Sequence, residues 1–171
     1  GSGDVIARAD RCCRKRHDTA RAAAAMLALQ PAIPDRCASI SASRHCARRV
    51  VTASVNHVSF NHPIPEGGIV ILESKVSRAF STSMEIYVDV WLDDVINGKR
   101  IHTNEGIYTF VAVDEYNKPV PIPQMEPETE LEKQRYEAAF RRKELSLILS
   151  GRMNPQDSVE LKKLFSEPKE D

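Results

Sequence analysis

The sequence lacks the features that mark several common functional classes. It has no net charge, since 24 Lys and Arg balance 24 Asp and Glu, and this balance gives no sign of binding to nucleic acid or to a membrane surface. No apolar run approaches the roughly 18–20 residues of a membrane span, and no apolar core of a signal peptide is visible. We therefore expect the 171 residues to fold as a globular cytoplasmic protein.

The four cysteines, at positions 12, 13, 37 and 46, form no Cys-x-x-Cys pair. Zinc-binding and thioredoxin-like interpretations therefore lack their spacing. Cys12 and Cys13 are adjacent and unsuited to a disulfide, so we expect free thiols in a reducing compartment. His45, His57, His62 and His102 are the histidines that a metal or Cys–His site could use. Cys46 beside His45 would point in a different direction on a helix, and His57 and Cys37 lack a third orienting group. The sequence accordingly predicts no metal site and no cysteine catalysis.

The middle of the chain shows four β patterns separated by turn signals. Strands are predicted over Val50–Phe60, Ile69–Ser77, a stretch from Ser83 to Leu92, and Ile101–Val113. Apolar and polar residues alternate in the third stretch, so one of its faces should pack on a core. The dipeptide Asn97-Gly98 predicts a hairpin, and Gly106 predicts a bulge or bend in the fourth strand.

Helical patterns lie on both sides of these strands. Asp35–Cys46 is rich in Ala, Ser and Cys, so a sheet could approach its backbone closely. Further along, Thr129 with Glu132 forms a capping-box pattern for a helix that runs toward Ser150 and stops at Gly151. Pro155 opens a last short helix through Phe165. Residues 4–34 have helix propensity but a poor apolar stripe, and their basic, Arg-rich character also permits a transit peptide.

The order of these segments resembles that of the hotdog-fold acyl-CoA thioesterases, in their bacterial single-domain branch. The resemblance covers about residues 35–123 and depends on the joint order of VVTASVNHVSFNHPI, GGIVILESKV, STSMEIYVDV and YTFVAVDEYNKPVPIP. It implies an α+β fold in which a long curved antiparallel sheet wraps around a central helix, followed by C-terminal helices. It also implies a homo-oligomer: a dimer, with further assembly as a trimer of dimers.

The N-terminal segment departs from this family's pattern, in which a conserved Asp-Thr-Asn and a Gly-Gly pair lead into the helix. Asp18 and Asp35 are 17 positions apart, as the pattern requires, but Ala20 replaces the Asn and Leu27-Ala28 replaces the Gly-Gly pair. A reading-frame slip in the gene or true divergence could explain this. Domain organisation is then an atypical segment 1–34, which begins with a Gly-Ser-Gly tag remnant, a hotdog core 35–125 and a helical extension 126–171.

The resemblance implies that an acidic residue on the central helix activates water for thioester hydrolysis, while backbone N–H groups at the helix start polarise the carbonyl. Asp35 is the position that carries this role over; the alternative is an ordinary helix-capping Asp. No cofactor is expected, and acyl-CoA is the expected partner and substrate.

Further residues are candidates for binding CoA. Ser81, Thr82 and Ser83 match the family segment near the pantetheine and phosphates, and Arg78 could face the phosphates. Each has an ordinary alternative, as strand-edge hydroxyls or as a solvated arginine. Because the changes at Ala20, Leu27 and Ala28 remove a water-positioning group and close backbone approach, a non-catalytic hotdog module that binds CoA esters or only oligomerises is the alternative function. A hotdog hydratase is disfavoured because no His lies near Asp35.

Overall fold

The computed structural model describes residues 5–9, 32–60, 62, 64, 68–94 and 97–166. The chain forms two compact units, Gly1–Met125 and Glu126–Asp171. No helix among the described residues is both long and apolar enough to cross a membrane.

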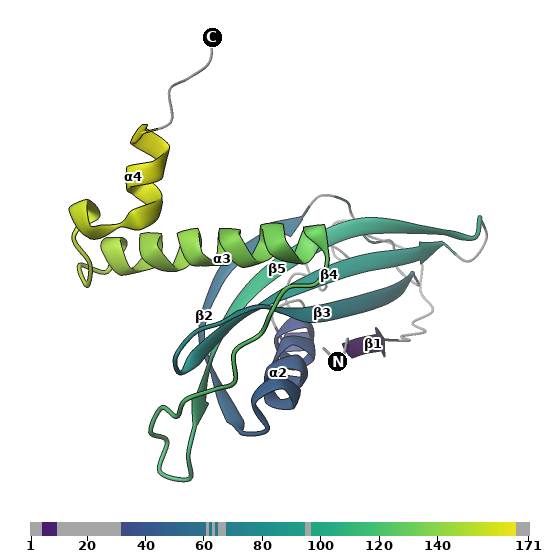
Figure 1. The fold of residues 1–171 in the computed structure, drawn as a ribbon. Helices are drawn as coiled ribbons and strands as arrows, with labels where there is room; N and C mark the ends of the chain where they lie inside the picture. Colours follow the sequence, from purple (N-terminus) through teal and green to yellow (C-terminus); the bar gives the residue numbers. More distant parts are fainter. Residues whose placement is uncertain are drawn as a thin grey trace. The chain divides into compact units, whose positions relative to one another are not determined.

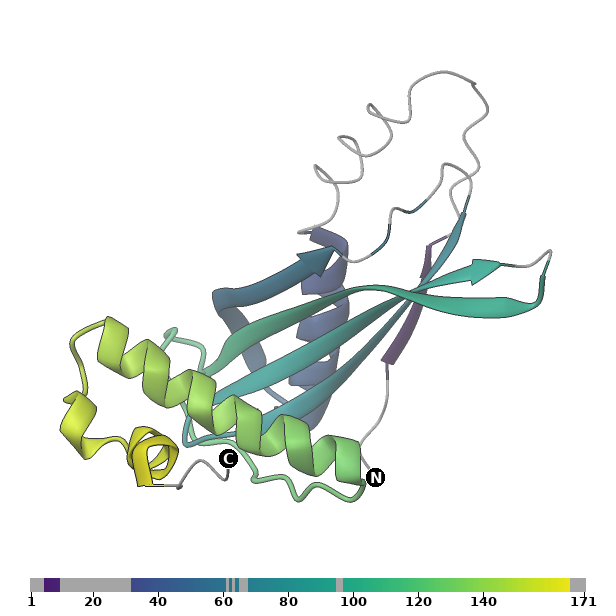
Figure 2. The ribbon, with the colours of Figure 1, turned by 90° about the horizontal axis from the view of Figure 1, so that it is seen from above.

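The first unit is built on a five-stranded antiparallel sheet with the order β1-β3-β4-β5-β2. Its strands are β1 (Val5–Ala9), β2 (Arg49–Phe60), β3 (Ile69–Ala79), β4 (Ser83–Asp94) and β5 (Lys99–Val113). The last four confirm the strands that the sequence predicts. The sheet bends around helix α2 (Ala32–Cys46) (Figures 1 and 2), which confirms the hotdog architecture.

Small side chains allow α2 to lie close against the sheet. Cys37, Ala38, Ser41, Ala42 and Cys46 are buried, at spacings that keep them on one helix face. They face the apolar side chains of the strands, where Met84, Ile86 and Val88 on β4 alternate with residues on the outer face. Phe110 and Tyr108 on β5 complete the same core.

A buried polar contact fixes α2 against β3. The Ser41 hydroxyl donates to the Ser74 carbonyl at 3.1 Å, and the Ser74 hydroxyl donates to the Cys37 carbonyl at 3.0 Å. The Cys37 thiol in turn donates to the Ser74 hydroxyl oxygen at 3.2 Å. The side-chain polar atoms of Cys37, Ser41 and Ser74 thus all have hydrogen-bond partners, as buried polar groups need. Both cysteines of α2 are free thiols, as predicted.

Gly98 and Gly106 are required at their positions for different physical reasons. Gly98 takes φ +63° in the β4–β5 turn, which confirms the hairpin. At Gly106 the predicted bulge is absent, since Gly106 pairs in regular register with Val58 and Val88. A Cβ at this position would lie 2.8 Å from Cε2 of Tyr108. The glycine therefore makes room for a ring on its own strand, and the register shifts occur in β2 instead.

The N-terminal segment differs from its predicted helical character where the structure describes it. Val5–Ala9 forms a strand that pairs antiparallel with β3, with Ala7 opposite Leu72. The hotdog sheet thus draws on residues that the sequence analysis assigned to the atypical segment. Cys12, Cys13, Ala20, Leu27 and Ala28 lie outside the described residues.

The second unit contains α3 (Glu130–Leu149), a 3₁₀ turn η1 (Pro155–Asp157) and α4 (Val159–Ser166). The predicted capping box is present: Thr129 Oγ1 accepts from the Glu132 N–H at 3.2 Å, and Glu132 Oε2 accepts from the Thr129 N–H at 3.1 Å. Gly151 has φ +69° just after α3, as a C-terminal stop requires. The single last helix predicted from Pro155 is wrong, because a 3₁₀ turn ends at Asp157 and α4 starts separately.

Glu144 of α3 holds the start of α4. Its carboxylate accepts from the Ser158 hydroxyl at 2.7 Å, the Glu160 N–H at 3.0 Å and the Val159 N–H at 3.3 Å. Burial raises the pKa of this carboxyl, but these hydrogen bonds, together with Lys163, outweigh it and bring the pKa below its ordinary value of 4.5. Glu144 therefore replaces the side-chain cap that α4 would otherwise need.

Candidate functional site

Asp35 lies in the first turn of α2, as its fourth residue. It is half-buried, and its Oδ1 accepts a hydrogen bond from the Thr52 hydroxyl on β2 at 3.0 Å. Thr52 points toward α2 because it shares a row with Phe110 and Met84 of the core. The helix predicted over Asp35–Cys46 is therefore present, but it begins earlier, at Ala32, which places Asp35 within its first turn.

Tyr108 is a second polar group near this carboxylate. It is 2% exposed, and burial, together with the negative charge of Asp35, raises the pKa of its hydroxyl to about 12. The phenol is thus neutral near pH 7 and keeps its proton for donation. Gly106 leaves the space in which the ring lies, so the β5 sequence Gly-Ile-Tyr positions this hydroxyl group.

This arrangement has the parts of a hydrolytic site. A carboxylate can take a proton from water, and the unpaired N–H groups of a helix start can stabilise an oxygen that becomes negative. Pro34 supplies no N–H in this turn, so the start of α2 offers one donor fewer than other sequences would. The polar neighbours of Asp35 can hold it in one orientation.

The predicted CoA-binding residues lie at the turn between β3 and β4. The carbonyl groups of Ser81 and Thr82 accept from the N–H groups of Ile122 at 3.0 Å and Ala112 at 3.0 Å, so their backbones hold this turn. The side chain of Ser83 faces away from α2, because Met84 beside it points into the core. The Arg78 guanidinium lies 5.7 Å from the ring centroid of Phe80.

Within one chain the structure therefore does not bring these residues to Asp35. They surround a turn on β3 and β4, whereas Asp35 lies against β2 and β5. What the sequence analysis missed are Thr52 and Tyr108, which contact or face Asp35. The alternation of β2 and β5 could have placed both side chains on the helix-facing side, once the pairing of the two strands was known.

His45, Cys37 and Cys46, which could in principle take part in catalysis, contact other residues of the fold. The His45 ring, at Nε2, lies 2.9 Å from the Pro123 carbonyl oxygen and ties the end of α2 to the segment after β5. Cys37 and Cys46 are buried. The Cys37 thiol contacts the Ser74 hydroxyl and the Leu72 carbonyl, and the Cys46 thiol contacts the Arg48 carbonyl.

Comparison with known proteins agrees with this fold. A family model described as the thioesterase superfamily matches residues 28–98. A Bacillus subtilis (strain 168) protein described as an uncharacterized acyl-CoA thioester hydrolase, YkhA, is 44% identical over 108 residues, which cover 63% of this chain and 63% of that protein. This chain thus spans slightly less than two thirds of the length of that curated relative.

Solved structures match this chain over a larger part of its length. An apo-hexameric acyl-CoA thioesterase is 33% identical with a TM-score of 0.70, and the match covers 96% of this chain and 94% of that chain. A Staphylococcus aureus acyl-CoA hydrolase, solved with butyryl coenzyme A, coenzyme A and coenzyme A disulfide, is 29% identical with a TM-score of 0.71 over 94% and 93%. This chain belongs to the hotdog-fold acyl-CoA thioesterase family of the thioesterase superfamily.

Proposed function

We propose that this protein hydrolyses acyl-CoA thioesters to free CoA and a carboxylic acid, with Asp35 as the general base. The observation that carries the proposal is the position of Asp35 in the first turn of α2, 3.0 Å from the Thr52 hydroxyl and close enough to Tyr108 to affect its pKa. A carboxylate and the N–H groups of a helix start meet there, as thioester hydrolysis needs.

The proposed reaction balances without any cofactor. Asp35 takes a proton from a water molecule as its oxygen attacks the thioester carbonyl, and the carbonyl oxygen becomes negative beside the N–H groups of the helix start. The tetrahedral intermediate then collapses, the carbon–sulfur bond breaks, and the CoA thiolate leaves and takes up the proton. Thr52 keeps one carboxylate oxygen in place during these steps.

A relative supports the same pair of residues. Among the structures of the S. aureus hydrolase are alanine variants of an aspartate and of a threonine. In that protein the two substituted residues are 17 positions apart in sequence, the separation of Asp35 and Thr52 in this chain. We infer that Asp35 and Thr52 act together here.

We also propose that the active form is a homo-oligomer. β2 is an edge strand of 12 residues, and Val51, Val55 and Val58 on it are 42–50% exposed. A long exposed edge strand of this kind is suited to pairing with a second sheet. Thr52 lies on β2, so the partner would come close to Asp35. The hexameric relative supports a trimer of dimers.

Native mass spectrometry tests this assembly. A charged side chain on an edge strand opposes edge pairing, so Val55→Lys should shift the protein from even-numbered oligomers toward monomer. Thr109→Lys, on the paired strand β5, is the control for a lysine added elsewhere on the sheet. A wild-type protein that is monomeric at micromolar concentration would contradict the proposal.

The residues proposed for CoA binding depend on this assembly. Arg78 and Ser81–Ser83 lie apart from Asp35 in one chain, so they would contact CoA whose thioester lies at the Asp35 of another protomer. The cytoplasm is the proposed compartment, in keeping with the free thiols of Cys37 and Cys46.

A non-catalytic CoA-ester binding module is the second candidate function. Pro34 favours it, because this residue lies in the first turn of α2 and removes one N–H that could polarise the carbonyl. Substitutions at Ala20, Leu27 and Ala28 point the same way from the sequence. Binding of acyl-CoA without release of CoA would support this candidate.

The deciding experiment measures thiol release from acyl-CoAs of short, medium and long chain length. Wild type should release CoA, and Asp35→Asn should reduce the rate by about 10²–10⁴ because the amide keeps the Thr52 contact but cannot take a proton. Asp93→Asn makes the same change at a half-buried residue near the β4–β5 turn and should keep the wild-type rate. Equal rates for wild type and Asp35→Asn would overturn the role of Asp35.

A further inference from the structure

The sheet face opposite α2 carries three carboxylates in one row. Glu73 on β3 is directly opposite Asp89 on β4, and Asp89 is directly opposite Glu105 on β5. Their neighbours Leu72, Val88 and Val90 belong to the core cluster beneath the sheet, so the three carboxylates point to the outer face. Like charges directly opposite each other destabilise a sheet, which makes a positive charge in this row favourable.

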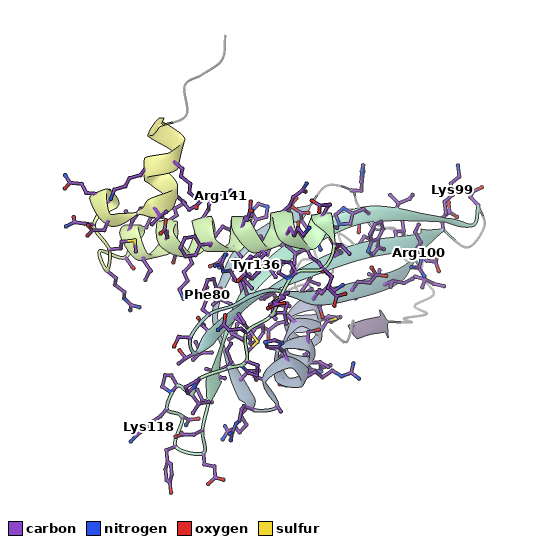
Figure 3. The ribbon with its side chains drawn as sticks, viewed as in Figure 1. Phe80, Lys99, Arg100, Lys118, Tyr136 and Arg141 are labelled. Carbon is purple, nitrogen blue, oxygen red and sulfur yellow. The ribbon has the colours of Figure 1, made fainter. Side chains whose placement is uncertain are left out.

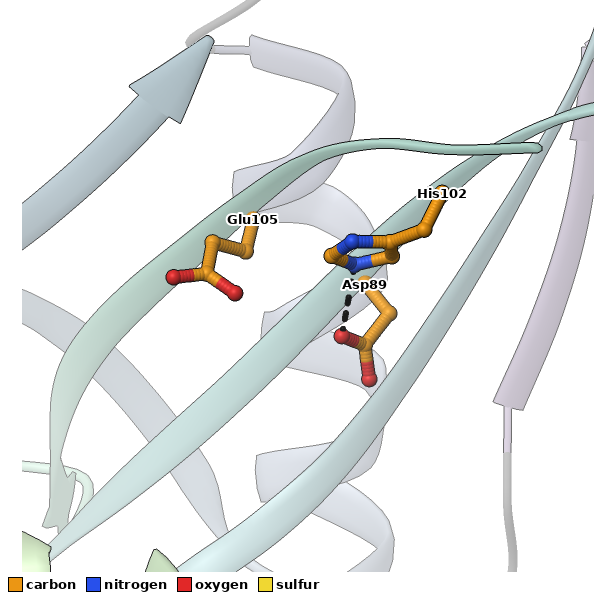
Figure 4. Close-up of side chains that lie close together, drawn as sticks. All are labelled: Asp89, His102 and Glu105. Atoms are coloured by element: carbon orange, nitrogen blue, oxygen red, sulfur yellow. Dashed lines mark hydrogen bonds and ion pairs between the residues drawn. The ribbon is translucent and has the colours of Figure 1, made fainter. Parts of the chain in front are cut away.

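Arg100, near the tip of the β4–β5 hairpin (Figure 3), supplies that charge at one end of the row. Its guanidinium nitrogen lies 3.6 Å from Glu73 Oε1. At the middle of the row lies His102 on β5, whose Nε2 is 3.1 Å from Asp89 Oδ1. Figure 4 shows the imidazole beside Asp89, with Glu105 on the same side of the sheet. One nitrogen and two carboxylate oxygens thus converge.

These three donor atoms lie within 4.8 Å of one another. Around a tetrahedral zinc ion bound at roughly 2.0–2.2 Å, ligand atoms are about 3.4 Å apart. The His102–Asp89 pair is already that close, and small rotations of the Glu105 side chain would bring in the third ligand. The side chains are 31% (His102), 15% (Asp89) and 28% (Glu105) exposed, so an ion can enter from solvent.

We propose that Asp89, His102 and Glu105 form a site for a divalent transition-metal ion, with zinc as the best match. One imidazole and two carboxylates suit zinc better than magnesium or calcium, which prefer oxygen ligands alone. A bound ion would place two positive charges between two carboxylates that face each other across β4 and β5. The site stabilises the outer face of the sheet and takes no part in hydrolysis at Asp35.

Surrounding residues orient the ligands as in other metal sites. The Tyr87 hydroxyl donates to Glu105 Oε2 at 2.5 Å. The Trp91 ring packs edge-on against His102, with ring centroids 4.8 Å apart. On the neighbouring strand β2, His57 Nε2 lies 4.0 Å from Glu105 Oε1, which places a fourth possible donor beside this carboxylate.

Isothermal titration of the chelator-treated full-length protein with Zn²⁺ tests the site. The titration uses a Cys12→Ser/Cys13→Ser background, because thiolates bind zinc strongly in their own right. One ion should bind per chain. His102→Gln and Glu105→Gln should each weaken binding at least tenfold, and Tyr87→Phe should weaken it about tenfold through loss of orientation. Zn²⁺ should also raise the unfolding temperature of the background protein.

Two controls separate a built site from loose attraction to carboxylates. Glu73→Gln removes a charge from the same row, and His45→Ala removes a histidine elsewhere; neither should change zinc affinity by more than about twofold. Co²⁺ in place of Zn²⁺ should give a visible absorption band that disappears in His102→Gln. The proposal is wrong if binding does not saturate at one ion per chain, or if Glu73→Gln weakens it as much as Glu105→Gln does.

Discussion

Asp35 and Glu144 both lie beside the first turn of a helix, but their surroundings are opposite. Asp35 is half-buried, and the one hydrogen bond that the described residues give it comes from Thr52. Glu144 is 5% exposed and accepts three hydrogen bonds from the start of α4. An ionised carboxylate has about four lone-pair sites, so Glu144 is nearly saturated and Asp35 keeps capacity for a water molecule.

The comparison separates a structural carboxylate from a reactive one by its partners. A carboxylate whose acceptor sites are all occupied holds its neighbours in place, so its replacement lowers the stability of the protein. It has no free acceptor site for a substrate or a water molecule. A partly satisfied carboxylate contributes little to the fold, and its replacement should act on chemistry. The two residues therefore predict opposite outcomes for similar substitutions.

The largest expected effect on stability comes from Glu144→Ala. Removal of the carboxylate leaves the Ser158 hydroxyl and two N–H groups of α4 without their acceptor, at a cost of about 3–4 kcal/mol in the unfolding free energy of the second unit. Hydrogen exchange should show the amides of Val159 and Glu160 losing their protection. Glu137→Ala, an exposed change on the same helix, should alter stability by less than about 0.5 kcal/mol.

Acid pH should reproduce part of this loss. The pKa of Glu144 is lower in the folded chain than its ordinary value of 4.5, so its stabilisation is present above pH 4.5 and declines as pH falls through the lower, folded-state pKa. The stability difference between wild type and Glu144→Gln should therefore narrow below pH 4.5. A difference that stays constant down to pH 3 would contradict this account.

A second test sharpens the description of the Asp35 region. Because the pKa of Tyr108 is raised from 10.0 to about 12 in the folded chain, its contribution is fully present below pH 10 and lost as pH rises toward 12. This change corresponds to at most about 2.7 kcal/mol. Relative to Tyr108→Phe, wild type should lose stability over that range, as measured by urea unfolding at a series of pH values.

Asp35→Asn refines the same measurement. Burial is the main cause of the raised pKa of Tyr108, and the charge of Asp35 adds to it. The neutral amide should therefore lower the pKa of Tyr108 by less than the full shift, which tyrosinate absorbance can follow with Tyr108→Phe as the reference. An unchanged pKa would mean that the carboxylate does not act on this phenol.

The strands could be predicted from the sequence because period-two alternation and turn residues act locally. β3 starts at Ile69, β4 starts at Ser83, and the hairpin turns at Gly98, all as predicted. Gly106 shows the limit of local rules: the glycine pattern fits a bulge, but the Tyr108 ring two residues on is the physical cause. β1 was missed because its five residues are too few to show a strand pattern and gain their strand structure from pairing with β3.

The residues of the candidate site also fall into those that local sequence can predict and those that it cannot. Asp35 could be placed at the start of a helix because helix boundaries depend on local sequence. Thr52, Tyr108 and the row of Asp89 and Glu105 could not be assembled, because a contact between strands depends on register, and a shift of one residue reverses every side chain. Register shifts within β2, near Thr52 and Val55, make that assignment harder still.

The smallest expected effect concerns the single bond that distinguishes Asp35 from a free surface carboxylate. Thr52→Val keeps the shape and β-propensity of the side chain but removes the hydroxyl that donates to Oδ1 at 3.0 Å. If Thr52 orients Asp35, kcat for acyl-CoA hydrolysis should fall about tenfold, about 1.4 kcal/mol of transition-state stabilisation, with little change in KM. Thr109→Val, which removes a hydroxyl bonded to Asn56 at 2.9 Å, should leave kcat unchanged. Equal kcat values for wild type and Thr52→Val would mean that the helix alone holds Asp35 in place, because no other described residue donates to its carboxylate.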